Sequence, residues 1–209
     1  MQTDAGFWDK HAAGYRARPI SDEQSYAYTL ERTASYLSPD DAVLELGCGT
    51  GGTALNLAKF AGCITATDFS RGMIEQALER PQVDNVSFEV ADIFDARFAS
   101  ESQDVLLAFN LLHLVPDAAR FVARAHDLLP KGGLFISKTP CVSDPSAALK
   151  WRLLVKLIPL MQLLGKAPPV RFLTIAELHT LLEEAGFEIV ETGNYPVQPP
   201  SHFVVARKL

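Results

Sequence analysis

A short apolar run over residues 42–46 leads directly into three closely spaced glycines, and a helix-like stretch follows at 51–60. The glycines are Gly47, Gly49 and Gly51, in the sequence VLELGCGTG. Glycine lets a backbone turn sharply and approach a ligand without a clash from a side chain. In an open α/β sheet, ligands bind outside the carboxyl ends of the strands, where the strand order reverses. This pattern therefore predicts an open sheet with a ligand site at the end of its first strand.

The alternation of strand-like and helix-like stretches continues along the chain. A helix opened by Thr174 precedes two final strand-like runs, which are joined by a connection too short to hold a helix and therefore predict an antiparallel hairpin. We expect an α/β fold, with a seven-stranded, mostly parallel sheet covered by helices on both faces, as a single domain over 1–209. The expected strands are 42–46, 63–68, 86–90, 104–109, 134–137, 187–192 and 202–207.

Charge and cysteine content narrow the function classes. The formal net charge of −6, from 25 acidic and 19 basic residues, argues against a surface devoted to nucleic acid. Three widely spaced cysteines and five scattered histidines form no disulfide framework and no metal-ligand spacing, so no metal is expected. The N-terminus lacks an apolar signal core, and a reduced, cytoplasmic location is expected.

Three acidic residues accompany the glycine loop. Glu45 precedes Gly47 by two residues, Asp68 ends the second strand and Asp92 follows the third. The glycine spacing also satisfies the GxGxxG pattern of dinucleotide-binding proteins, in which an acid binds the ribose hydroxyls. Asp68 has that role in either case. Glu45 separates the two ligands, because its carboxylate would repel a pyrophosphate but attract an amino group and a sulfonium, as in S-adenosylmethionine.

Five segments together resemble class I S-adenosylmethionine-dependent methyltransferases, in particular the small-molecule branch that includes ubiquinone- and menaquinone-biosynthesis methyltransferases. The resemblance implies a Rossmann-like sheet with strand order 3-2-1-4-5-7-6 and an antiparallel seventh strand. The segments are ELGCGTG (45–51), TATDFSRGMIEQA (65–77), FEVADIFD (88–95), FNLLHLVPD (109–117) and LLPKGGLFIS (128–137).

The resemblance also implies the roles of residues at the site. Asp68 binds the ribose, Asp92 and Ile93 bind the adenine edge, and Tyr15 closes over the methionine part. From the residues alone, both aspartates could instead be helix caps, Met73 could be plain core and Tyr15 could be a staple for the first helix. The expected cofactor-binding residues are Glu45, Gly47, Cys48, Gly49, Gly51, Asp68, Phe69, Met73, Asp92, Ile93 and Asn110.

Methyl transfer requires mainly that nucleophile and methyl group be held in line, and no acid–base dyad is evident in the sequence. His113, just past the fourth strand, is a candidate base, and Tyr15 is a second candidate catalytic residue; a structural role for His113 is the alternative. We expect methyl transfer from S-adenosylmethionine, which leaves S-adenosylhomocysteine, to a small hydrophobic molecule such as a quinone or lipid. The alternatives are a small polar amine, acid or thiol as acceptor, a nicotinamide-dependent oxidoreductase, or a non-catalytic adenosyl-ligand binding module.

Two segments outside the core motifs are expected to cover the site. Residues 1–37 form an N-terminal helical lid, in which Ser21 is expected to cap a helix from about 22 to 37, and residues 140–173 form a substrate cap. The cap is apolar at helical spacing, is interrupted by Pro159 and carries five basic residues but no acid between Asp144 and Glu177. It could be a lid, a contact with an anionic membrane surface through about 150–171, or a packed part of the core. Lys138, at the end of the fifth strand, is expected to be solvated.

Overall fold

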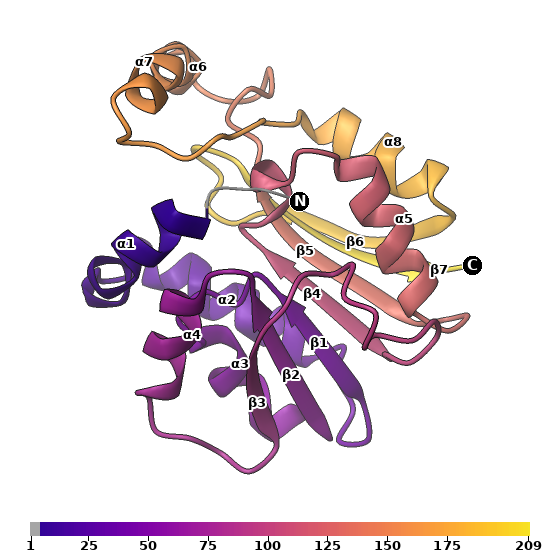
Figure 1. Cartoon of the computed structure of the whole chain (residues 1–209). Helices are drawn as coiled ribbons and strands as arrows, with labels where there is room; N and C mark the ends of the chain where they lie inside the picture. The colour runs from indigo at the N-terminus through magenta and orange to yellow at the C-terminus, as the bar shows by residue number, and fades with distance from the viewer. Residues whose placement is uncertain (1–4) are drawn as a thin grey trace.

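The computed structural model describes residues 5–209 and contains one seven-stranded sheet, shown with its helices in Figure 1. Its strand order is 3-2-1-4-5-7-6, with the first five strands parallel and the seventh antiparallel to both of its neighbours. The expected fold and strand order are therefore confirmed. The strands are β1 (Ala42–Leu46), β2 (Cys63–Asp68), β3 (Val86–Val90), β4 (Val105–Phe109), β5 (Leu134–Pro140), β6 (Phe187–Asn194) and β7 (Ser201–Lys208).

Helices cover both faces of the sheet. On one face α5 and α8 pack on a cluster that includes Leu44, Leu106 and Phe135, and on the other α2, α3 and α4 pack on Val43 and Leu107. The alternation of side chains along each strand divides these two clusters, as expected for a sheet buried on both sides. The helices are α1 (Ala5–Ala17), α2 (Glu23–Ala34), α3 (Gly52–Leu57), α4 (Arg71–Leu78), α5 (Ala118–Leu128), α6 (Leu149–Val155), α7 (Ile158–Leu163) and α8 (Ile175–Glu184), with 3-10 turns η1 (Ala58–Phe60) and η2 (Leu112–Leu114).

Helix ends follow local polar side chains. Thr174 and Glu177 form the predicted capping box of α8, and Gly186, with φ of +91°, follows its end. The prediction for α2 is wrong in one detail, because its N-cap is Asp22, which accepts a hydrogen bond from the Ser25 amide, rather than Ser21. Both residue types cap helices well, so their adjacency leaves the choice to the tertiary structure.

The segment 140–173 contains two helices that are not packed in the core. Pro159 divides the expected helix into α6 and α7, and neither helix contains a buried residue. Figure 1 shows the two helices projecting from the body of the protein, away from the sheet. The interpretation as packed core is therefore wrong for α6 and α7, although Cys141 and Leu173 at the two ends of the segment belong to the core. Among residues 5–209, no helix is long and apolar enough to cross a membrane.

Candidate functional site

A cleft runs along the carboxyl ends of β1, β2 and β4. It consists of three adjoining pockets, each of which is lined by Gly47. Helix α1 contributes Trp8 and Tyr15 to its wall, and the segment before α8 contributes Pro168 and Pro169. The cleft therefore lies where an open parallel sheet is expected to bind its ligand, enclosed by two segments that are remote in sequence.

The glycine loop between β1 and α3 has the backbone that the sequence predicts. Gly47, Gly49 and Gly51 have φ of +67°, +55° and +76°, a region that residues with a Cβ rarely adopt. The loop residues differ in what they face. Gly47, Cys48 and Gly49 line the cleft, whereas a Cβ at Gly51 would lie 2.5 Å from the Phe88 ring, so this glycine permits close packing in the interior.

Glu45 lines the pocket that Tyr15 and Asn110 also line, and its carboxyl group has a strongly raised pKa. The residue is only 2% exposed, and its Oε2 atom has no hydrogen-bond partner among residues 5–209. The pKa of Glu45 is raised to about 8, mainly by burial and in smaller part by the nearby Asp68 carboxylate. A hydrogen bond from the Ala54 backbone opposes the shift. An unpaired buried carboxyl oxygen favours a ligand that brings a positive charge or a hydrogen-bond donor.

Asp68 lies at the end of β2, buried in the floor of the cleft. Its Oδ2 accepts a hydrogen bond from the Gly49 amide at 3.0 Å, and its Oδ1 accepts one from the Ser70 amide at 2.9 Å. Burial raises the pKa of Asp68, although these two amides oppose the shift. Each carboxylate oxygen has two lone pairs, so both can still accept a second hydrogen bond from a diol.

The predicted adenine residues gather at the apolar end of the cleft. Asp92 and Ile93 line one pocket together, Met73 lines the next, and Phe69 lines both. Asp92 Oδ1 accepts a hydrogen bond from the Phe94 amide at 2.8 Å, which holds the carboxylate after β3. The structure thus brings together an apolar slot and one carboxylate at its edge.

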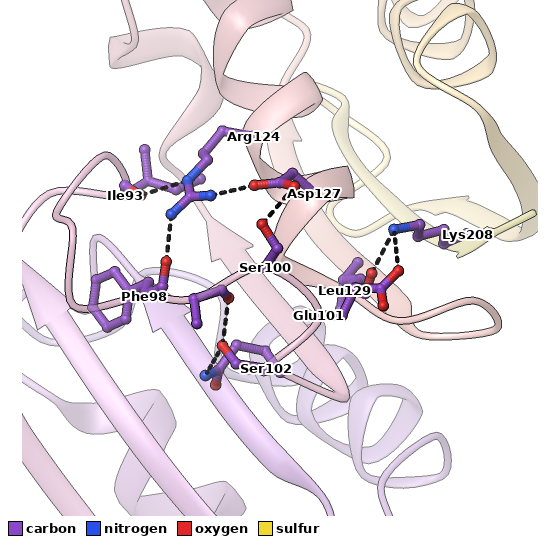
Figure 2. Close-up of polar contacts among 11 residues, drawn as sticks. Ile93, Phe98, Ser100, Glu101, Ser102, Arg124, Asp127, Leu129 and Lys208 are labelled. Atoms are coloured by element: carbon purple, nitrogen blue, oxygen red, sulfur yellow. Dashed lines mark hydrogen bonds and ion pairs between the residues drawn. The ribbon is translucent and has the colours of Figure 1, made fainter.

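The loop that carries Asp92 and Ile93 is fastened by a residue that the sequence analysis does not identify. Arg124 on α5 donates hydrogen bonds to the backbone oxygens of Ile93, at 3.4 Å, and Phe98, at 2.5 Å, and pairs with Asp127 (Figure 2). A guanidinium can donate in several fixed directions at once, so one side chain holds two points of the loop. No local signal reveals this role, because the partners lie 26 and 31 residues away.

At the opposite side of the cleft lie Asn110 and Tyr15. Asn110 follows β4 with φ of +54°, which asparagine tolerates better than most residues, and lines two of the pockets. The Tyr15 ring lies over the glycine loop, 3.7 Å from the position of a Cβ at Gly49, and makes an edge contact with Trp8. Trp8 was not predicted, although its spacing of seven residues from Tyr15 indicates a shared helix face.

Helix α1 is held over the cleft by polar contacts with α4 and the residue before it. Asp9 Oδ1 accepts hydrogen bonds from the Ser70 hydroxyl at 2.6 Å and from the Gly72 amide at 2.9 Å, at the start of α4. Arg16 pairs with Glu79 at the far end of the same contact. The predicted N-terminal lid thus has a defined attachment; its residues 1–4 lie outside the described part of the chain.

His113 and Lys138 lie apart from the cleft-lining residues. The His113 ring stacks on Phe172, with centroids 5.8 Å apart and planes 7° apart, and burial lowers its pKa to about 4. Lys138 is 8% exposed and donates a hydrogen bond to Thr29 Oγ1 on α2 at 3.0 Å. The expectation of a solvated Lys138 is therefore wrong, since its side chain runs under α2.

The donor and acceptor groups of the cleft fit S-adenosylmethionine. The unpaired oxygen of Glu45 suits the cationic methionine end, Asp68 retains acceptor capacity for the ribose hydroxyls, and Asp92 lies beside an apolar slot for the adenine ring. The Glu45 carboxyl group can ionise to pair with the ammonium group of S-adenosylmethionine, whereas the pyrophosphate of a dinucleotide brings no cation to this position. The glycine spacing is compatible with both S-adenosylmethionine and a dinucleotide, and the charged groups of the cleft favour S-adenosylmethionine.

Comparisons with known proteins agree with this geometry. Residues 37–186 match the model of a family described as a methyltransferase domain. The chain is 27% identical to the demethylmenaquinone methyltransferase of Lactobacillus johnsonii, over 72% of this chain and 69% of that protein. It is also 35% identical, over 53% of its length, to part of the polyketide synthase component of lovastatin nonaketide synthase from Aspergillus terreus, but spans only 4% of that protein.

Solved structures show the same fold. An S-adenosylmethionine-dependent methyltransferase from Mesorhizobium loti superimposes with a TM-score of 0.71 at 20% sequence identity, covering 88% of this chain and 98% of that one. The family match spans β1 to α8, which includes the glycine loop and the three acidic residues. The resemblance stated from the sequence is thereby confirmed, and the chain belongs to the methyltransferase domain family.

Proposed function

We propose that this protein transfers a methyl group from S-adenosylmethionine to a small, apolar acceptor. The observation that carries the proposal is the placement of Glu45, Asp68 and Asp92 at the ends of β1, β2 and β3 along one cleft. These carboxylates match the amine, diol and adenine of the cofactor in that order. Membership of the methyltransferase domain family supports the same cofactor.

The residues of the cleft supply binding and orientation. When bound, S-adenosylmethionine supplies an electrophilic methyl group on a sulfonium. Glu45 accepts a hydrogen bond from the ammonium group, Asp68 holds the ribose, and Trp8 and Tyr15 of α1 limit the access of water. Orientation and exclusion of water suffice for transfer to an acceptor that is already ionised or readily attacks carbon.

We assign His113 a structural role in this mechanism. Its ring stacks on Phe172, it is absent from the residues that line the three pockets, and its pKa of about 4 makes it a weak base at neutral pH. Tyr15 remains our candidate for contact with the reacting groups, because it lines two of the pockets beside Gly49.

An apolar acceptor is supported by the walls of the cleft and by the relatives. Aromatic and aliphatic side chains line much of the cleft, and the relatives include a demethylmenaquinone methyltransferase and a lovastatin synthase component. A small polar amine, acid or thiol is the alternative acceptor. The cleft-lining apolar side chains include Trp8, Leu46, Phe69, Ile93, Phe109, Leu111, Leu114, Val115, Phe121, Pro168 and Pro169.

Transfer of a methyl label tests the proposal. The protein is incubated with methyl-labelled S-adenosylmethionine and a fractionated extract of its own cells, and we expect label in the organic phase. The variant Asp68→Asn should lose the label, because cofactor affinity falls by roughly 100-fold when a buried charged partner is removed. Asp84→Asn, a change at an exposed aspartate, is the matched control.

Each other outcome points to a different function. Label confined to water-soluble molecules would replace the apolar acceptor by a polar one and leave methyl transfer standing. Binding of S-adenosylhomocysteine without any transfer would indicate a binding module. Calorimetric binding of NADH in preference to S-adenosylhomocysteine would indicate an oxidoreductase and overturn the proposal.

A further inference from the structure

Helices α6 and α7 form an exposed apolar surface that the proposed function does not use. We call residues 149–166 the basic hairpin. Neither of its helices has a buried residue, and in Figure 1 they stand away from the sheet and from the other helices. The exposed apolar side chains, between 41% and 83% accessible, are Leu149, Leu153, Leu154, Leu157, Leu160, Met161, Leu163 and Leu164. A contiguous apolar surface of this kind marks a contact with another surface.

The charge of this surface is opposite to that of the whole chain. No acidic residue lies between Asp144 and Glu177, whereas the chain as a whole has a net charge of −6. The basic residues of that interval form no ion pair within the described part of the chain. These residues are Lys150, Arg152, Lys156, Lys166 and Arg171. Their charge is therefore available to an anionic partner.

Composition favours a lipid surface over a protein as that partner. Protein interfaces are depleted in lysine and rely on tryptophan, tyrosine and arginine, while leucine contributes less often to their binding energy. The basic hairpin presents mainly leucine and lysine, which is the composition of helices that lie in a membrane interface. A symmetric contact with a second copy would bring two positively charged surfaces together, which is unfavourable.

The basic hairpin is also continuous with the wall of the cleft. None of the residues that line the three pockets comes from α6 or α7, so its leucines do not serve as a lid in this conformation. The chain that follows contributes Pro168 and Pro169 to the cleft, and the Arg171 amide donates a hydrogen bond to the His113 carbonyl at 2.8 Å. A surface bound by the hairpin would therefore lie close to the entrance of the apolar cleft.

We propose that the basic hairpin docks this protein on an anionic lipid surface. Its leucines enter the boundary between headgroups and acyl chains, and its lysines and arginines contact the anionic headgroups. This assignment goes beyond the proposed function, because binding to vesicles requires neither the cofactor nor methyl transfer. A failure of one proposal can therefore be distinguished from a failure of the other.

Vesicle sedimentation with the full chain tests the docking. Vesicles of phosphatidylcholine alone are compared with vesicles that also contain phosphatidylglycerol. We expect roughly tenfold or stronger binding to the anionic vesicles at low salt, and a clear loss of binding at high salt. The double change Leu157→Ser and Leu160→Ser should reduce binding by roughly tenfold or more, because both side chains lose apolar area for insertion.

Matched control variants test whether the effects on vesicle binding are specific to the basic hairpin. Leu78→Ser removes a leucine of α4 that is as exposed as Leu157, at 53%, and should leave binding unchanged. Lys156→Glu should weaken binding, whereas Lys131→Glu, the same charge change in an exposed loop, should weaken it much less. Thermal unfolding and S-adenosylhomocysteine binding confirm that each variant is folded.

Four results would overturn the docking proposal. The first is no preference for anionic vesicles, and the second is equal loss of binding in patch and control variants. The third is concentration-dependent self-association in sedimentation velocity that the leucine changes abolish, since this would assign the hairpin to a second copy. Binding of an acidic protein but not of vesicles would likewise replace lipid by protein as the partner.

Discussion

The acid-lined end of the sheet and the basic hairpin both reverse the usual distribution of polar and apolar groups. At the sheet end, the carboxyl group of Glu45 is buried, at 2% exposure and without a partner for one oxygen. In the hairpin, Leu163 is 83% exposed. The first arrangement fits a ligand small enough to be enclosed, and the second fits a surface too large to be enclosed. Each reversal identifies the chemistry of what is bound.

Folding stability should separate the two regions most strongly. Leu107→Ala removes a fully buried side chain from β4 and should lower the free energy of unfolding by about 2–5 kcal/mol. Leu157→Ala in the hairpin should change it by no more than about 0.5 kcal/mol, because the side chain is 53% exposed. Urea unfolding of both variants measures the difference. Similar losses in the two variants would mean that the hairpin packs on the core in solution.

The buried carboxyl group predicts a pH dependence that the hairpin does not have. The pKa of Glu45 is raised to about 8, so below that pH the pairing of its carboxylate with the ammonium group of a ligand must release a proton. Affinity for S-adenosylhomocysteine should therefore rise between pH 6 and pH 8, by up to roughly tenfold per unit. Calorimetry on Glu45→Gln should show a flat profile, while Glu75→Gln, at an exposed position on α4, should keep the slope.

The same shift has a consequence for stability, with a defined sign. Because the pKa of Glu45 is higher in the folded protein than its usual value of 4.5, its protonated form stabilises the fold at low pH. This contribution is lost as pH rises toward and through about 8. Between pH 4.5 and about 8, the Tm of the unliganded protein should fall more steeply than the Tm of Glu45→Gln. Parallel curves for the two proteins would show that the carboxyl group is not the source of the loss.

Arg124 tests whether the adenine end of the cleft depends on a distant support. Arg124→Ala should weaken S-adenosylhomocysteine binding by about three- to tenfold, because the loop that carries Asp92 loses hydrogen bonds at two carbonyls. Arg124→Lys should not restore affinity, since an ammonium group cannot span both acceptors. Arg207→Ala, at an exposed arginine on β7, is the control. Full affinity in Arg124→Ala would remove the residue from the site.

His113 gives the smallest expected effect and the sharpest test of the mechanism. His113→Gln should change kcat by less than about threefold, because the ring contacts Phe172 and is not needed to accept a proton. Steady-state kinetics with the identified acceptor measures this change. A loss of roughly 100-fold in kcat at unchanged cofactor affinity would instead identify His113 as the general base.

Sequence patterns were sufficient for the frame of this molecule because they act over short distances. The apolar alternation predicted β2 at 63–68 with its observed bounds, and Thr174 with Glu177 predicted the start of α8. The glycine loop and the acids at the strand ends predicted where a ligand would lie, since parallel strands place their carboxyl ends at one edge.

What the sequence could not predict depends on partners that are remote along the chain. The burial of Lys138 depends on Thr29, which lies 109 residues earlier, and the role of Arg124 depends on the backbone of another loop. Helical periodicity at 149–164 is the same whether the apolar face is buried or exposed, so only the structure distinguishes the two. The position of Trp8 in the cleft also depends on a remote contact, the packing of α1 on α4.

The attachment of α1 has a consequence for the timing of turnover. Asp9 binds the start of α4 through Ser70 and Gly72, and a Cβ at residue 72 would come within 2.9 Å of the Asp9 Cα, so the contact requires glycine there. Ser70 also donates its amide to Asp68, which places the attachment of the covering helix two residues from the floor of the cleft. Release of a ligand beneath Trp8 and Tyr15 is expected to require opening of this attachment together with the Arg16–Glu79 ion pair. The rate at which spent cofactor is replaced is therefore expected to depend on contacts that lie outside the cleft.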